Sequence, residues 1–432
     1  MENLNLLELD RVWSTEPLPL SPELDIDALL KKTEDARAKV FETVDEMRDE
    51  AIEFLQSLIR INSVNPSPTF EREIADYVAE KMRQLSMDVH QIEPEKNRVS
   101  NLGLYHGFEG HKTLLINSHL DTVPEGTLAD WVAPPFEARI VGDRIIGRGA
   151  KDCKLGMASS LMALEAIQRS GVGLRGNYMI TTTAGEETGG GLGLPQLIDT
   201  GLVKADYAIY AEGEPKQLVV GARGFCQIEI SVKGTTTHSS NKHLGSNAIV
   251  KMAPVIKAID SMTFTNWKPH PVVPGKPIAS VNMISGGFKE NVVPDSCTIV
   301  VDIRFLPGMT IDGVMADVER VMDSLQRQDP FMGGLEYSVN VRSLGRPMIT
   351  DANDPFVKVM QRAVLDVTGE EFPAFGMTAS TDARWLVNDA KIPTILFSLA
   401  ESRSHVPNEF VIIDQYIQNI KIYAETALLL LS

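Results

Sequence analysis

The sequence predicts an α/β fold, in which a mostly parallel sheet flanked by helices carries a smaller inserted α+β domain. Helical segments alternate with short apolar runs from residue 46 to about residue 224, the order of an α/β domain. Residues Phe225 to Val232 alternate apolar with polar, as a half-exposed antiparallel strand does. The first pattern returns at about Arg342. We therefore expect one discontinuous domain over residues 46–224 and 342–432, and an inserted domain over residues 225–341.

The larger domain begins with an amphipathic helix over residues 46–61, whose apolar residues recur at the helical spacing. The same two patterns, helical spacing and short apolar runs, predict the elements that follow it. These are helices over 70–85, 155–167, 355–367 and 381–388, strands over 89–92, 102–105, 113–117, 178–183, 207–210 and 394–398, and a hairpin over 138–146.

The inserted domain reads as a βαββαβ-like run. Its strands are expected over 225–232, 278–284, 297–305 and 337–341, with helices over 247–259 and 314–325. Residues 1–45 precede both domains as an N-terminal extension. Its second half has helical composition, and we interpret it as a helix that packs on the outside of a domain or an oligomer.

Composition excludes several classes of protein. The formal net charge of -17 argues against a nucleic-acid or anionic-membrane partner, because both require clustered Lys and Arg. The apolar tail 427–431 is too short to span a bilayer. The three cysteines show no paired spacing, and the N-terminus has no basic segment followed by an apolar one, so we expect a cytoplasmic protein in a reducing compartment.

His119 and Asp121 follow the apolar run 114–116, which is typical of a buried parallel strand. In open α/β sheets, groups that touch ligands lie beyond the carboxyl ends of strands. A histidine there can bind a metal through one ring nitrogen while a carboxylate orients the other. Alone, this pair is also what an ordinary polar loop contains.

Further acids and a histidine stand at comparable positions, after a predicted strand or where a loop meets a helix: Asp152, Glu186, Glu187, Glu212 and His405. An Asp at a helix start is most often an N-cap. Two adjacent acids beside a glycine run are not what a solvated surface requires. Two metals that share a bridging carboxylate need about five such ligands, and imidazole with carboxylate suits zinc, with cobalt or manganese as alternatives.

Eight stretches, in order, give the chain a specific resemblance: SHLDTVP, GRGAKDCKLGM, AGEETGG, YAEGEP, THSS, NVVPDSCTIVVDIRF, GMTASTDAR and SHVPNE. The chain resembles the dinuclear-zinc family of aminoacylases, acetylornithine deacetylases, succinyl-diaminopimelate desuccinylases and glutamate carboxypeptidases. The resemblance runs from about Leu55 nearly to the end. It implies a catalytic domain with an inserted lid and dimerisation domain.

The resemblance implies a ligand set for two Zn²⁺ ions. His119 and Glu212 would hold one ion, Glu187 and His405 the other, and Asp152 would bridge them. Glu214 is the alternative to Glu212, which we prefer because it follows the predicted strand directly.

The same resemblance implies roles around the metals. Asp121 would orient His119, and Glu186 would be the general base. A cis peptide is expected after Asp152, and His238 would stabilise the oxyanion, often from the partner subunit of a homodimer.

Three further residues would contact substrate. Arg304 would clamp a carboxylate, as a bidentate guanidinium can, unless it only forms a salt bridge with Asp302. Asn291 and Gly376 fall where relatives line the substrate site. One departure is Leu155, where the family usually has Gly.

We therefore predict a metal-dependent hydrolase of a C–N amide bond. The expected substrate is a small molecule, an N-acyl amino acid or a short peptide with a free carboxylate. A dipeptidase or carboxypeptidase with the same machinery is the main alternative. A carbamoyl hydrolase and a non-catalytic metal-binding relative are further ones, and the presence of Glu186 argues against the last.

Overall fold

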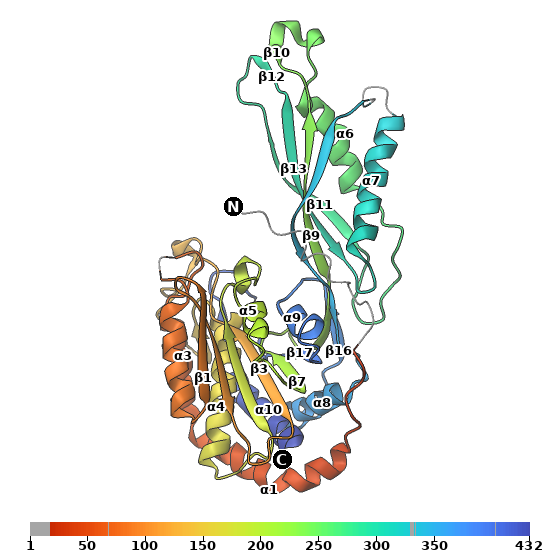
Figure 1. Ribbon diagram of the computed structural model, residues 1–432. Helices are drawn as coiled ribbons and strands as arrows, with labels where there is room; N and C mark the ends of the chain where they lie inside the picture. Colours follow the sequence, from red (N-terminus) through yellow and green to blue (C-terminus); the bar gives the residue numbers. More distant parts are fainter. Residues whose placement is uncertain (1–17, 68, 329–331, 333, 402) are drawn as a thin grey trace. The chain divides into compact units, whose positions relative to one another are not determined.

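The computed structural model describes residues 18–67, 69–328, 332, 334–401 and 403–432 (Figure 1). The first part of the extension, residues 1–17, lies outside this range. The described chain divides into two units. The first comprises Leu18–Val220, Thr350–Phe375 and Thr381–Ser432, and the second comprises Gly221–Ile349 and Gly376–Ser380. The domain bounds expected from the sequence, 46–224 with 342–432 and 225–341, stay predictions.

One large sheet organises the first unit. Its strands run in the order β1 (Asp88–Glu95), β2 (Arg98–Tyr105), β6 (Asn177–Thr183), β3 (Thr113–His119), β7 (Tyr207–Tyr210), β17 (Thr394–Leu396) and β8 (Leu218–Ala222). The four central strands, β6, β3, β7 and β17, are parallel, and the flanking pairs are antiparallel. This arrangement confirms the predicted α/β class.

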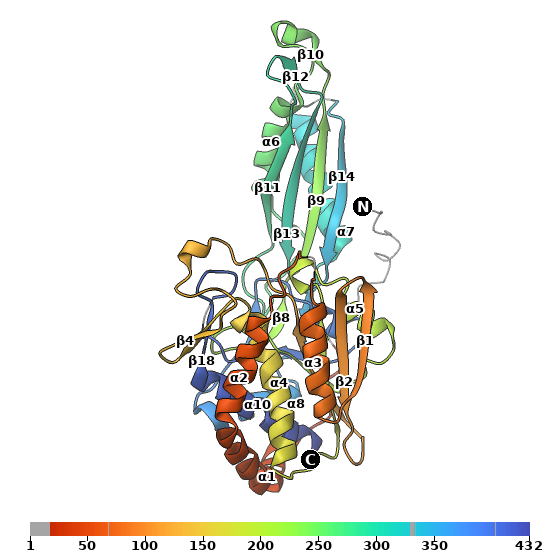
Figure 2. The same ribbon diagram turned by 90° about the vertical axis from the view of Figure 1, so that its left-hand side faces the viewer.

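Helices cover this sheet. Helix α3 packs against β2 (Figure 2), while α4 and α10 pack against the central strand β3. Helix α1, from the extension, packs against α4 and α10. The helices of the unit are α1 (Ile26–Glu46), α2 (Arg48–Arg60), α3 (Arg72–Gln84), α4 (Leu155–Arg169), α5 (Leu194–Asp199), α8 (Pro355–Thr368), α9 (Ala383–Asn388) and α10 (Ile413–Leu431).

Helix α10 is the largest element that the sequence prediction missed, because only an apolar tail was read there. The helix is buried on nearly all sides, and even Asn419, Glu425 and Thr426 are shielded from solvent. A helix enclosed in this way shows no apolar stripe against a polar face, so periodicity does not reveal it. Strand β18 (Phe410–Ile412), just before it, was missed too; it forms a small sheet with β5 (Arg144–Ile146) and β4 (Arg139–Val141).

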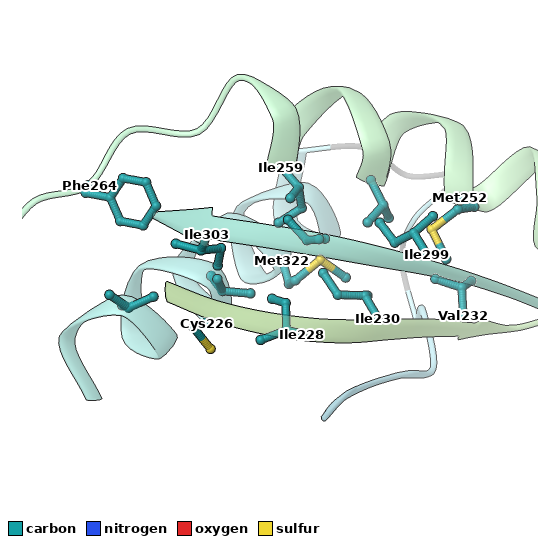
Figure 3. Packing of buried hydrophobic residues seen from close by; sticks show 14 of the residues in the cluster. Cys226, Ile228, Ile230, Val232, Met252, Ile259, Phe264, Ile299, Ile303 and Met322 are labelled. Atoms are coloured by element: carbon teal, nitrogen blue, oxygen red, sulfur yellow. The ribbon is translucent and has the colours of Figure 1, made fainter. Parts of the chain in front are cut away.

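The second unit contains a four-stranded antiparallel sheet in the order β11 (Ile278–Gly286), β13 (Ser296–Phe305), β9 (Gly224–Lys233) and β14 (Tyr337–Gly345). Helices α6 (Ala248–Asp260) and α7 (Ile311–Gln328) accompany it. Buried and half-exposed residues alternate along β9, as predicted, and the same alternation runs along β13. Figure 3 shows Met252 and Ile259 of α6 packed over Ile230, Ile299 and Ile303 of the sheet.

Short strands complete both units: β10 (Thr237–His238), β12 (Val292–Val293), β15 (Met348–Ile349) and β16 (Ala374–Met377). Strand β15 pairs with Gly221 and Ala222 of β8. Among the described residues, no helix combines the length and the apolar character that crossing a membrane requires.

The buried carboxyl of Glu425 gives the fold a pH dependence. Arg37 of α1 lies 3.1 Å from Glu425 Oε1 and 3.0 Å from Asp366 Oδ2. Burial is the largest cause that raises the pKa of Glu425 from 4.5 to about 8. Since the folded chain then holds this proton more tightly than the unfolded chain, the stability that it contributes is present below about pH 4.5 and is lost as the pH rises through about 8.

We predict that the free energy of unfolding of Glu425→Gln changes less between pH 5 and pH 8 than that of the parent. At pH 8 we expect the variant to be more stable than the parent. Urea unfolding at several pH values between 5 and 8 measures it. Glu53→Gln, which alters an exposed pair with Arg60, is the control and should keep the parental slope. A parental slope in Glu425→Gln would contradict the assignment.

Candidate metal centre

The candidate site lies at the edge of the large sheet where the parallel strands end. His119 is the last residue of β3. Glu186 and Glu187 follow β6 in the 3-10 turn η4 (Glu186–Thr188), and Glu212 follows β7. Because parallel strands present their carboxyl ends at one edge, residues far apart in the chain converge there. Asp152 arrives from the turn η3 (Ala150–Lys154) before α4, and His405 from the segment after β17.

The buried imidazole of His119 is fixed by its Nδ1, which lies 2.9 Å from the backbone carbonyl oxygen of Asp121. A carbonyl oxygen only accepts, so Nδ1 carries the proton and donates. Nε2 then presents a lone pair. It lies 2.8 Å from Asp152 Oδ1 and 3.2 Å from Glu212 Oε1.

A second cluster forms around His405. Its Nε2 lies 3.0 Å from Glu187 Oε1 and 3.4 Å from Asp152 Oδ2. The two oxygens of Asp152 thus face two different histidines. Each histidine also faces a glutamate of its own, Glu212 for His119 and Glu187 for His405. This is the arrangement of donors around two cations that share one carboxylate.

The donor set fits divalent cations on physical grounds. Carboxylate oxygens face imidazole nitrogens, and two electron-pair donors attract each other only with a proton or a cation between them. Glu212 Oε1 is shielded from solvent and makes no well-aligned hydrogen bond, despite its distance to His119. Donors about 2.0 Å from a tetrahedral zinc lie roughly 3.3 Å apart, close to the separations seen here.

Electrostatics supports the same conclusion. Hydrogen bonds from His405 to Asp152 and then to Glu187 raise the pKa of His405 to about 10. The carboxylates of Asp152 and Glu187 therefore stabilise a positive charge at this position. The residues present fit two divalent metal ions held by nitrogen and oxygen ligands.

Asp121 ties the two metal-ligand loops together. Its carboxylate accepts hydrogen bonds from the backbone N–H groups of Glu186, at 3.1 Å, and Glu187, at 3.2 Å. Asn65 Nδ2 donates to the same carboxylate at 3.1 Å, and Asn65 in turn accepts from Arg98. The carboxylate itself lies 3.6 Å from His119 Nδ1, so the backbone carbonyl is the nearer acceptor for that ring. Sequence reasoning missed Asn65, because nothing local marks a loop amide as a partner of a distant aspartate.

Glu186 lies beside the ligands on a turn that needs glycine before it. Gly185 has a φ of 77°, and a Cβ there would stand 2.4 Å from Arg98 Nη2. Burial, and then the charges of Glu212 and Asp382, raise the pKa of the Glu186 carboxyl. A carboxylate held in this way is a better proton acceptor than one in water.

The peptide bond between Asp152 and Cys153 is cis, as expected from the sequence. The Cys153 thiol lies within 4.8 Å of the candidate ligand atoms of His119 and Glu212. Burial raises the pKa of this thiol, and its Sγ lies 3.6 Å from the carbonyl oxygen of Ala211. Glu214, the alternative to Glu212, is exposed to solvent.

In the second unit, His238 and Asn291 lie close together. His238 pairs with Val292 across β10 and β12, and the Asn291 carbonyl accepts from the N–H of Ser239 at 3.0 Å. His238 Nδ1 accepts from the N–H of Ser240 at 3.2 Å, so the neutral ring carries its proton on Nε2. The exposed ring therefore offers an N–H donor.

Arg304 and Gly376, the other two residues predicted to contact substrate, lie among protein groups that the structure describes. Arg304 forms the salt bridge with Asp302 that was the alternative interpretation, with Nε 2.6 Å from Oδ1 and Nη2 3.2 Å from Oδ2. Gly376 is buried, and a Cβ there would stand 2.6 Å from the Cα of Val273. The roles predicted for both in substrate binding stay predictions.

The fold and the paired His–carboxylate clusters define the class of a metal-dependent hydrolase. The chain belongs to peptidase family M20/M25/M40, whose model matches residues 115–429. It is accordingly a hydrolytic enzyme that acts on amide bonds, as the sequence predicted.

The chain is also similar to two curated relatives, and it shares its fold with one solved structure. It is 25% identical over 406 residues to N-formyl-4-amino-5-aminomethyl-2-methylpyrimidine deformylase of Halalkalibacterium halodurans, covering 88% of this chain and 93% of that protein. It is 25% identical over 345 residues to succinyl-diaminopimelate desuccinylase of Thioalkalivibrio sulfidiphilus, covering 78% and 87%. An M20 family metallo-carboxypeptidase of Sulfolobus solfataricus shares the fold, with a TM-score of 0.73 at 23% identity over 88% of this chain and 99% of that chain.

We predict that Asp121→Ala weakens metal binding about 10–100-fold, because two backbone N–H groups beside the ligands lose their acceptor. Competition against a fluorescent zinc chelator measures the affinity. Asp143→Ala removes an exposed carboxylate from the β4–β5 hairpin and should leave binding unchanged. Parental affinity in Asp121→Ala would show that the ligand loops do not depend on it.

Proposed function

We propose that the protein hydrolyses the C–N amide bond of an N-acyl amino acid, or of a short peptide with a free carboxylate, as a dinuclear zinc enzyme. The observation that carries the proposal is the position of Asp152 between His119 and His405, with Glu186 in the same turn as the ligand candidate Glu187. The deformylase and the desuccinylase support an acylated amine as the substrate, since both names describe removal of an acyl group.

His119, Glu212, Glu187 and His405 would hold the two ions, with Asp152 shared between them. When bound, the ions polarise the scissile carbonyl and lower the pKa of a water molecule. Glu186 accepts the proton of the attacking water and delivers it to the leaving nitrogen, which lets the C–N bond break without releasing an amide anion.

Two residues of the second unit would complete the reaction. His238 Nε2–H would donate to the oxyanion of the tetrahedral intermediate. The guanidinium of Arg304 already pairs with Asp302 through Nε and Nη2, so a substrate carboxylate would approach through Nη1. Asn291 and Gly376 would line the substrate site, as the resemblance implies.

We further propose that His238 acts on the site of a partner subunit in a homodimer. Strand β11 bonds to β13 on one side and, in the described chain, to no strand on the other. Met283 and Ile284 of this strand are 63% and 59% exposed, and Phe288, just beyond its end, is exposed too. An apolar edge strand of this kind is protected by pairing with another chain, and a second copy is the occupant that we propose.

Glu186→Gln should abolish turnover while both metals stay bound, because the amide cannot accept the water's proton. Hydrolysis of a panel of N-acyl amino acids and dipeptides, with metal content measured on the same samples, tests this. Glu214→Gln, at an exposed position nearby, should turn over normally. Activity in Glu186→Gln would remove it as the base, and parental hydrolysis of dipeptides alone would establish a dipeptidase instead of a deacylase.

His238→Ala should lower kcat by about 100-fold or more, the loss expected for an oxyanion donor. His243→Ala, in the same loop, is the control. Mixing His238→Ala with Glu186→Gln should restore part of the activity, because a mixed dimer holds one site with both intact residues. Mixtures that stay inactive although mixed dimers form would show that His238 does not act across subunits.

A further inference from the structure

A buried carboxylate outside the ligand set holds the loop that presents Asp152. Glu409 is 1% exposed. Its Oε1 accepts from the backbone N–H groups of Lys151, at 2.9 Å, and of Asp152 itself, at 3.0 Å. Its Oε2 accepts from the N–H of Gly149 at 3.3 Å. One side chain thus binds three backbone donors of a single tight turn.

The turn needs such an acceptor because its backbone is not regular. Within η3, Asp152 has φ of -119° and ψ of 89°, and Cys153 is also non-helical. Strand β5 ends at Ile146 and helix α4 begins at Leu155, so no preceding helical turn supplies acceptors for the N–H groups of Gly149, Lys151 and Asp152. Buried N–H groups without acceptors are costly, about 1–3 kcal/mol each. The Glu409 carboxylate supplies the missing acceptors and thereby fixes the turn.

A buried arginine balances the charge of this carboxylate. Arg148 is 2% exposed and donates from Nη1 to Glu409 Oε2 at 2.8 Å. Its guanidinium lies 5.2 Å from the centre of the Trp131 ring. The pair is enclosed on both sides, so removing one charge leaves the other buried without compensation.

The same residues join the two loops that supply metal ligands. Glu409 follows His405 by four positions, and the ladder between β18 and β5 continues into this junction, where the N–H of Gly147 donates to the Glu409 carbonyl at 2.9 Å. Lys151 Nζ adds a second link to the His405 loop by donating to Ser404 Oγ at 2.9 Å. The turn of Asp152 and the loop of His405 are therefore held as one piece.

We propose that Glu409, paired with Arg148, is a positioning residue that sets Asp152 and His405 at the spacing which two metal ions require. The inference rests on the proposed function, since it takes Asp152 and His405 as metal ligands. Glu409 does not touch the metals or the substrate in this account; it acts through the backbone of the ligand loops.

The test compares Glu409→Gln with Glu425→Gln. Both replace a buried glutamate that lies beside an arginine of the same unit, but the ion pair described for Glu425 is with Arg37 on α1 and involves no ligand loop. Zinc affinity is measured by chelator competition, folding by urea unfolding, and kcat and KM across a range of zinc concentrations.

We expect Glu409→Gln to bind zinc about 10–100-fold more weakly than the parent, and to recover activity as zinc is raised. Glu425→Gln should bind zinc like the parent even where its stability differs. Parental zinc affinity in Glu409→Gln, or an equal loss in Glu425→Gln, overturns the inference. A parent that binds no zinc would instead overturn the proposed function, so the two failures are distinct.

If Glu409→Gln does not fold, Glu409→Asp replaces it. The shorter side chain keeps the charge beside Arg148 but withdraws from the N–H groups of Lys151 and Asp152. A folded Glu409→Asp protein with weakened zinc binding supports the inference, and one with parental zinc binding overturns it.

Discussion

The candidate metal centre depends on the position of the Asp152 carboxylate between the imidazoles of His119 and His405. Around it stand Glu186, Glu187 and Glu212, so several negative charges are gathered at one partly buried edge of the sheet. Like charges at this density repel strongly in a medium of low dielectric constant. The arrangement is stable only if a positive charge lies among the carboxylates. The raised pKa of His405 shows that these carboxylates stabilise a proton on its imidazole. A pair of divalent cations would neutralise more of this negative charge than a single proton does.

The parallel sheet is what makes this concentration achievable. Strands β3, β6 and β7 end side by side; β3 ends in the ligand His119, and the base or a ligand follows β6 and β7 within three residues. The sheet fixes these ends, but the ligands on loops need other support. Asp121 supplies it for the turn of Glu186 and Glu187, and Glu409 for the turn of Asp152. Both act by accepting backbone N–H groups, which fixes a loop more firmly than a contact between flexible side chains.

Much of this could be read from the sequence, for reasons that the structure makes clear. His119, Glu187 and Glu212 were identifiable because polar residues directly after apolar runs mark the carboxyl ends of buried strands. His405 was marked in the same way, and Asp152 by its place where a loop meets a helix. The bridging role of Asp152 needed the family motifs, since an aspartate at a helix start is most often a cap. Glu409, Asn65 and Arg98 could not be found, because their partners are backbone groups and side chains far away in the sequence. Helix α10 escaped for a different reason: a helix enclosed by protein has no polar face to give it periodicity.

The central claim is that two cations share Asp152. Crystals grown with zinc, with diffraction recorded on both sides of the zinc absorption edge, test it most directly. The account predicts two anomalous peaks about 3.5–4 Å apart, one beside His119 and Glu212, the other beside His405 and Glu187, with an oxygen of Asp152 on each. A single peak, or two peaks that Asp152 does not touch, would contradict it.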